Sequence, residues 1–216
     1  MGGFTYENNK KNPRIYNNSD EFGMCSLFVK EFRIALRPLL KYKNVGMLHQ
    51  RLMKLCSKIK LLDTTAEQGS RTMGGGLRTL KGKMLLREFV FTPKAGIRQH
   101  FGNPEIDEVD FTLTWRGFDP SSGRFPKGAT DFELIYLLLA YDPDINLFTT
   151  YEAVPIRRSK EGKAEVLVMP LARNVKKKEG MHFIPVIGLR YLELLGEEEY
   201  ACLGQDAVGI EILGVL

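Results

Sequence analysis

The sequence predicts an α+β fold in which a helical N-terminal part precedes an antiparallel β-sandwich of about seven strands. Apolar residues recur at three- and four-residue steps up to about residue 62, which is the period of a helix with one buried face. Beyond about residue 84 they recur at steps of two, in short segments rich in β-branched and aromatic residues. A glycine-rich stretch separates the two patterns. The predicted divisions are an extended arm (1–18), a helical hairpin (19–67), a glycine-rich hinge (68–83) and a β-sandwich domain (84–216).

Length and composition favour a folded protein with a substantial core. The chain has 216 residues, of which 44% are hydrophobic and 26% charged, as in ordinary globular proteins. Its first ten residues lack the apolar stretch of a secretory signal, and no apolar run is long enough to span a bilayer. These features predict a protein made in the cytoplasm, with no membrane span; they leave open the final location of any assembly it forms.

The arm is predicted from its polar composition. Residues 1–18 contain five asparagines and few apolar side chains. Such a segment usually frays unless it packs on its own domain, on a neighbouring copy or in a lattice. Four side chains could anchor it by adding a strand to an exposed sheet edge: Phe4, Tyr6, Ile15 and Tyr16.

Two helices are expected next. Ser19 is a good N-cap for the first, which should end near Arg37-Pro38, and Asn44 can cap the second, which extends to about Leu62. The outer side of the second helix carries a basic face: Arg51, Lys54, Lys58 and Lys60. After it, Gly74, Gly75 and Gly76 predict a hinge or turn, because consecutive glycines lose much backbone entropy in a helix.

The strands are predicted from alternating hydrophobicity between turn signals such as Asp142-Pro143-Asp144. One strand, 132–142, is apolar on both faces, which is typical of a central strand covered by a second sheet on one side and by helices on the other. The candidate strands are Met84–Phe91, Val109–Trp115, Phe132–Asp142, Tyr151–Ile156, Ala164–Met169, His182–Tyr191 and Ala207–Leu213.

Charge is divided unevenly along the chain. Residues 1–104 hold 19 Lys and Arg against 7 Asp and Glu, or +12, whereas residues 105–216 hold 12 against 19, or −7; the sum is +5. A basic half and an acidic half favour head-to-tail association of copies, or nucleic-acid binding by the basic half. An acidic face is expected at Glu105, Asp107, Glu108 and Asp110.

Motifs for catalysis or metal binding are weak. Cys25, Cys56 and Cys202 are far apart, which favours small buried hydrophobes over a disulfide framework or a metal pair. The three histidines have no ligand spacing, and Asp142-x-Asp144-x-Asn146 lacks the later residues of a calcium loop. Besides self-assembly and nucleic-acid binding, a third and less favoured hypothesis is a carbohydrate or metal site that uses Trp115 and the acidic face. The sequence therefore predicts no enzyme, no cofactor and no metal.

Two segments resemble a family of uncharacterised bacterial proteins of similar size. They are Asn17-Asn18-Ser19-Asp20-Glu21-Phe22-Gly23, similar to an S-E-F-G motif near the family's N-terminus, and the C-terminal strands from Phe183-Ile184-Pro185 to Ile212. The resemblance covers about a quarter of the chain, and Asp20, inserted between Ser19 and Glu21, departs from the family's spacing. It implies helices followed by β-strands and no known activity.

These observations predict a non-enzymatic structural protein that assembles with copies of itself into a filament, tube or shell. The basic N-terminal part of one copy would bind the acidic β domain of the next. The alternative is a nucleic-acid-binding accessory protein that uses the basic helical face.

Overall fold

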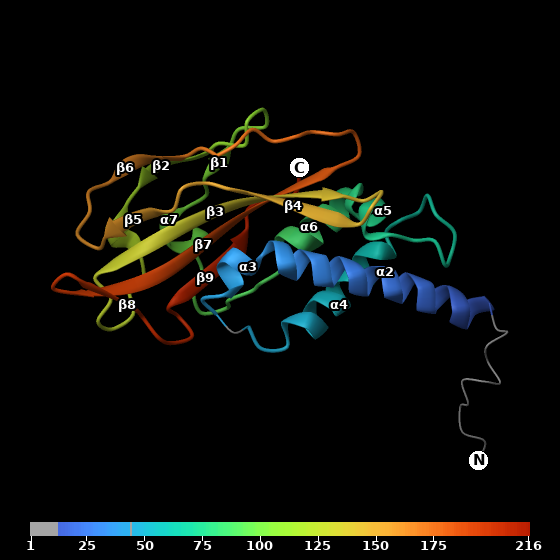
Figure 1. Cartoon of the computed structure of the whole chain (residues 1–216), viewed down its shortest axis with the longest axis horizontal. Coiled ribbons are helices and arrows are strands. Elements are labelled where there is room, and N and C mark those ends of the chain that lie inside the picture. The colour runs from blue at the N-terminus through green and yellow to red at the C-terminus, as the bar shows by residue number, and fades with distance from the viewer. Residues whose placement is uncertain (1–12, 44) are drawn as a thin grey trace, which may run out of the picture.

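The computed structural model describes residues 13–43 and 45–216, and it shows three layers (Figure 1). Five of the described helices cover one face of a six-stranded antiparallel sheet, and a three-stranded antiparallel sheet covers its other face together with the short helix at Arg98–Phe101. The predicted α+β fold with a β-rich C-terminal part is therefore confirmed. The helices are α2 (Pro13–Ala35), α3 (Arg37–Leu40), α4 (Leu48–Lys60), α5 (Met73–Leu77), α6 (Leu80–Arg87) and α7 (Arg98–Phe101), with a short 3₁₀ turn at Pro120–Ser122.

The large sheet is built around two long strands. Its order is β4-β3-β7-β8, with β5 also paired to β3 and β9 also paired to β7; the small sheet has the order β1-β2-β6. The strands are β1 (Glu105–Ile106), β2 (Leu113–Phe118), β3 (Asp131–Asp142), β4 (Leu147–Glu152), β5 (Ile156–Ser159), β6 (Glu165–Met169), β7 (His182–Leu195), β8 (Glu198–Ala201) and β9 (Val208–Ile212).

Strand β3 is buried on both faces, as its sequence predicts. Every residue from Phe132 to Tyr141 is buried. Ile135, Leu137 and Leu139 face the helices. Side chains of the opposite parity, including Leu134 and Tyr136, pack against the small sheet. Alternate side chains of this one strand thus belong to two different hydrophobic cores, one on each face of the sheet.

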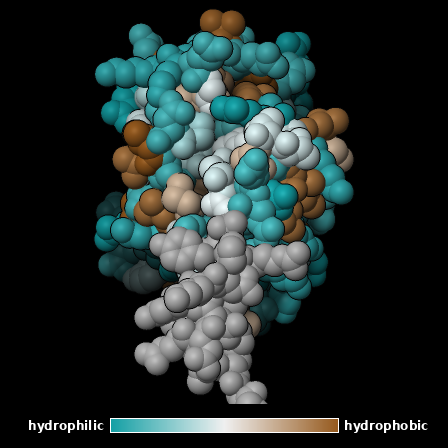
Figure 2. Space-filling model, turned by 90° about the vertical axis from the view of Figure 1, so that its right-hand side faces the viewer, coloured by the Kyte–Doolittle hydropathy of each residue, from teal (hydrophilic) through white to brown (hydrophobic). Residues whose placement is uncertain are grey.

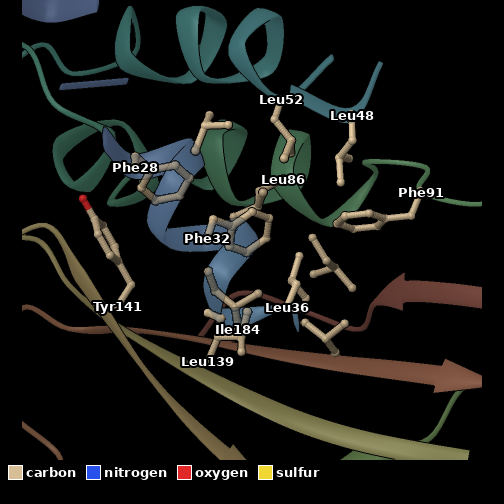
Figure 3. Close-up of a cluster of buried hydrophobic side chains, with 14 of the residues drawn as sticks. Phe28, Phe32, Leu36, Leu48, Leu52, Leu86, Phe91, Leu139, Tyr141 and Ile184 are labelled. Carbon is tan, nitrogen blue, oxygen red and sulfur yellow. The ribbon is translucent and has the colours of Figure 1, made fainter. Parts of the chain in front are cut away.

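Aromatic and aliphatic side chains together fill the space between the helices and the large sheet (Figure 3). Phe28 and Phe32 of α2 stack with ring centroids 5.7 Å apart, and the Phe28 ring meets the Tyr141 ring of β3 edge-on at 5.0 Å. Cys25 and Cys56 are buried in the same core, as expected of small hydrophobes, while Cys202 is half-buried.

The first helix begins earlier than the sequence predicts. Helix α2 starts at Pro13, so the expected extended arm is wrong for residues 13–18, and Ser19 lies inside the helix rather than at its cap. Proline suits the first turn of a helix because its missing N–H would have no partner there. Ile15 and Tyr16 therefore belong to a helix, whereas Phe4 and Tyr6 lie outside the described residues.

The predicted glycine hinge is also wrong. Gly74, Gly75 and Gly76 form most of helix α5, whose first turn is capped by Thr72 Oγ1 accepting from the Gly75 amide at 3.0 Å. A Cβ atom on Gly74 would lie 2.3 Å from Pro143 Cβ, and one on Gly76 would lie 2.1 Å from the Ile59 carbonyl oxygen. The glycines permit close packing of α5 against α4 and the β3–β4 turn, which outweighs their entropic cost.

Three expected strands differ from the observed elements. Residues 80–87 form helix α6, capped by Thr79, where a strand over 84–91 is predicted. The strand expected at 109–115 begins four residues later, and the one expected at 151–156 is replaced by parts of β4 and β5. The strands predicted at 132–142, 164–169, 182–191 and 207–213 are confirmed, with small differences at their ends except that β7 continues to Leu195.

A buried ion pair ties α2 to α4. Lys60 Nζ donates to Glu21 Oε2 at 2.5 Å, and the Gly69 amide donates to Glu21 Oε1 at 2.8 Å. Both charged side chains are almost completely buried. Burial alone would raise the pKa of Glu21, but the hydrogen bonds from Lys60 and Gly69 and the charge of Lys60 lower it below its ordinary value.

We expect Gly76→Ala to lower the free energy of unfolding by about 1–3 kcal/mol, because the new methyl group would overlap the Ile59 carbonyl. Gly23→Ala is the matched control: Gly23 lies in α2, and a Cβ atom added there would have no neighbouring atom within 4 Å. This control should be neutral or stabilising by up to about 1 kcal/mol. Urea denaturation measures both; equal effects would contradict the packing role of α5.

Glu21→Gln should lower the free energy of unfolding by about 3–5 kcal/mol at neutral pH, because it leaves Lys60 buried without its partner. The ordinary pKa of Glu21 is 4.5, and its pKa in the folded state is lower. The ionised Glu21 therefore stabilises the fold at pH values above 4.5, and this contribution is lost as pH falls through the folded-state pKa. The difference in the free energy of unfolding between wild type and variant should therefore shrink below about pH 4.5.

Denaturation at a series of pH values measures this difference. Asp20→Asn, at an exposed neighbouring position, is the control and should change little at any pH. A Glu21→Gln variant as stable as wild type at neutral pH would contradict the role of the ion pair.

Candidate anion-binding groove

The segment between β6 and β7 carries basic side chains on an apolar anchor. Val175 and Met181 pack, partly buried, against the cluster that contains Phe111 and Tyr151. At the start of the segment, Leu171 forms an isolated bridge with Ala153. The cationic residues between these anchors are exposed: Arg173, Lys176, Lys177 and Lys178.

A hollow of about 320 Å³ lies between this segment and β4. Arg173 donates from Nη2 to the Thr150 carbonyl at 2.8 Å, and its guanidinium lies 4.8 Å from the centre of the Tyr151 ring. The Tyr151 hydroxyl accepts from the Lys176 amide at 3.1 Å. The lining contains four basic side chains and no carboxylate. Its residues are Thr149, Tyr151, Arg173, Asn174, Lys176, Lys177, Lys178 and Met181.

A second hollow of about 450 Å³ shares Lys177 with the first. Lys177 Nζ donates to the Glu108 carbonyl at 2.9 Å and lies 4.7 Å from the centre of the Phe111 ring. Lys83 of α6 and Glu108 also line this hollow, and the apolar part of its lining includes Phe183 and Val215. We call the two hollows together the basic groove.

Helices α5 and α6 bring further positive charge to the start of β7. Burial lowers the pKa of His182, and the charges of Lys83 and Arg78 lower it further, so the ring is neutral at pH 7. His182 Nε2 lies 3.2 Å from the Gly74 carbonyl oxygen, which ties α5 to β7. The buried histidine thus supports the position of the groove, while Arg78 and Lys83 add to its charge.

A lysine occupies the place that a calcium ion would take at Asp142-x-Asp144. Lys178 Nζ lies 3.1 Å from Asp142 Oδ2 and 2.7 Å from Asp144 Oδ2, and this contact lowers the pKa of Asp144. Asn146 turns toward the core and accepts a hydrogen bond from the Tyr141 hydroxyl. The two aspartates therefore lie in the turn between β3 and β4 and form ion pairs with Lys178.

The opposite end of β7 is acidic. This strand has fourteen residues and spans about 45 Å at about 3.3 Å per residue. It leads into the β7–β8 hairpin, where Glu197, Glu198 and Glu199 follow one another and Leu194 and Leu195 are exposed. Glu199 pairs with Arg157 and Arg190, whereas Glu197 has no ion pair within the described residues. We call residues 194–200 the acidic hairpin; it lies at the left end of the molecule in Figure 1.

The basic face predicted on the second helix is divided by the fold. Lys54 and Lys58 are exposed, but Lys60 is buried against Glu21. Arg51 donates to the Val90 carbonyl and lies over the Phe89 ring. The prediction of a single basic face is therefore wrong for Lys60, and Arg51 is held by local contacts.

The predicted acidic face stabilises a turn. Asp107 Oδ1 accepts from the Val109 and Asp110 amides, Asp110 Oδ1 accepts from the Thr112 amide at 2.8 Å, and Glu105 pairs with Arg116. The backbone hydrogen bond from Thr112 lowers the pKa of Asp110. Residues 13–43 and 45–216 contain no group of three His, Cys, Asp or Glu side chains that could hold a metal ion.

Trp115 is a core residue. It is 1% exposed and donates from Nε1 to the Phe101 carbonyl at 2.7 Å. A carbohydrate site that stacks on its ring is therefore excluded. The signal that could have located the groove was the run of three lysines at 176–178, which on its own is typical of a solvated turn.

Comparison of the chain with protein-family models, with curated proteins and with solved structures gives no match. The resemblance seen in residues 17–23 and in the C-terminal strands stays a prediction. Among the described helices, none combines the length and the apolar character needed to cross a membrane.

Proposed function

We propose that the protein is a non-enzymatic structural protein that assembles head to tail, with the acidic hairpin of one copy bound in the basic groove of the next. The observation that carries the proposal is the placement of these two features at opposite ends of β7. An interface between two different surfaces of one chain repeats itself and produces rings or filaments. The cationic surface of this assembly differs from the one that the charge asymmetry predicts, because Arg173 and the lysines at 176–178 lie in the acidic half of the sequence.

The two surfaces are opposite in charge, and both carry apolar side chains. Of the four cations that line the first hollow, Lys178 is paired with Asp142 and Asp144, whereas the other three form no ion pair within the described residues. The hairpin presents two glutamates outside the Arg157 and Arg190 network, Glu197 and Glu198. The exposed Leu195 beside them could contact the apolar part of the lining of the second hollow, which includes Phe183 and Val215. Figure 2 shows the end of the molecule from which α2 extends, where a mostly hydrophilic surface surrounds small hydrophobic patches.

The groove suits a short acidic segment better than a nucleic acid. Phe111 and Tyr151 are buried and covered by Lys177 and Arg173, so neither ring is open for base stacking, which supplies much of the affinity for single strands. Nucleic-acid binding by the basic helical face is the alternative function, because Lys54 and Lys58 are exposed on α4 and the net charge is +5.

We expect two double variants to be monomeric on their own and to assemble when mixed. Lys176→Glu/Lys177→Glu places two glutamates in the groove, and Glu197→Lys/Glu198→Lys places two lysines on the hairpin. Each variant alone brings like charges together, whereas the mixture restores both pairings in alternating copies. Sedimentation velocity of nuclease-treated protein at about 20 mM and about 500 mM NaCl measures the assemblies, which should shrink with salt.

Lys54→Glu/Lys58→Glu on α4 is the control, because it makes the same charge change on exposed residues outside the groove. It should assemble like the wild type. A wild type that is monomeric at both salt concentrations contradicts the proposal. Salt-sensitive binding of labelled DNA by that monomer, lost in Lys54→Glu/Lys58→Glu, would favour the alternative function.

A further inference from the structure

A separate hollow of about 310 Å³ lies at the free edge of β9. The end of α6, the segment 88–96 and helix α7 enclose it together with β9. None of its lining residues belongs to the basic groove or to the acidic hairpin. Its volume is at the lower end of the range for small-molecule sites.

Hydrogen bonds fix the wall between segment 92–98 and β9. Thr92 Oγ1 accepts from the Ile210 amide at 2.9 Å, which satisfies an edge donor of the strand. A Cβ atom on Gly209 would lie 2.6 Å from the Ala95 carbonyl oxygen, so the segment approaches β9 as closely as a glycine allows. On the opposite side, Arg51 holds the Val90 carbonyl. The walls are therefore formed before any ligand binds.

The guanidinium of Arg98, which lines the hollow, is oriented by the carboxylate of Glu211. Glu211 Oε1 accepts from the Ile97 amide at 2.6 Å, and Glu211 Oε2 accepts from Arg98 Nε at 2.7 Å. The other two guanidinium nitrogens of Arg98 have no hydrogen-bond partner among the described residues. Only 27% of the Arg98 side chain is exposed. A half-buried guanidinium with free N–H groups is a suitable donor for a carboxylate.

Two carboxamides stand beside this arginine. Gln99 and Asn103 line the hollow, and neither side chain makes a hydrogen bond within residues 13–43 and 45–216. Gln99 lies over Gly96, where a Cβ atom would be 2.7 Å from Oε1, so the glycine leaves room for the carboxamide. Val90 and Pro93 supply apolar surface. Donors thus gather next to apolar side chains in a hollow whose lining also includes Arg87, Glu88 and the Glu211 that pairs with Arg98.

We propose that this hollow binds a small organic acid, whose carboxylate would accept hydrogen bonds from Arg98, Gln99 and Asn103 and whose apolar body would lie against Val90 and Pro93. Polar groups that fix the orientation of a ligand next to apolar side chains are a usual feature of small-molecule sites. The proposal does not depend on head-to-tail assembly, because it uses no residue of the groove or the hairpin.

Ligand-observed ¹⁹F NMR with 4-fluorobenzoate tests the site, since it works for monomers and assemblies alike. We expect binding with a Kd of about 1 mM or tighter. The neutral counterpart, 4-fluorobenzyl alcohol, should bind at least about tenfold more weakly, because it cannot accept a charge-assisted pair of hydrogen bonds.

Two variants locate the binding. Gln99→Ala/Asn103→Ala should raise the Kd for 4-fluorobenzoate about tenfold through loss of hydrogen bonds, and Val90→Trp should abolish binding by filling the hollow. His100→Ala is the control on the same short helix, because His100 does not line the hollow. Equal binding of acid and alcohol, no binding of either by wild type, or unchanged binding by both variants would overturn the proposal.

Discussion

The pairing of β3 with β7 supports the other parts of the structure. The two strands are in register from Asp131 opposite Leu192 to Tyr141 opposite His182. Their helix-facing side chains form one core and the opposite side chains form another. Because both faces are covered, neither strand can slip by one residue without exchanging the contents of the two cores. This constraint fixes the positions of both ends of β7.

The ends of these strands therefore determine where charge is presented. The segment after β6 returns to β7 beside the β3–β4 turn, where Lys178 meets Asp142 and Asp144. At the other end, Glu133 of β3 pairs with Arg157 and Arg190, and Arg190 also contacts Glu199 of β8. Hydrogen bonds to both arginines lower the pKa of Glu133 although its burial would raise it. The remaining glutamates of the hairpin stay outside this network.

Some charged residues stabilise the fold instead of forming binding surfaces. Lys60 and Glu21 join α2 to α4 in the interior, and Glu211 orients both Arg98 and the amide of Ile97. Counting charges along the chain assigns all of these residues to a basic or an acidic half. A charge that is buried and paired contributes little to the field outside the protein. The surface charge of this molecule therefore differs from the charge order of its sequence.

The sequence by itself determined the α+β order, the two-faced character of β3, the burial of Cys25 and Cys56, and most of the later strands. These features follow from local periodicity, which reports the burial of a face wherever its partner lies. Only the tertiary structure decided that Gly74–Gly76 are helical, that Lys60 is buried, and that the basic groove and the hollow at Arg98 exist. Each of these depends on contacts between segments distant in sequence, such as Gly76 with Ile59 and Arg98 with Glu211, and local propensity carries no information about such contacts.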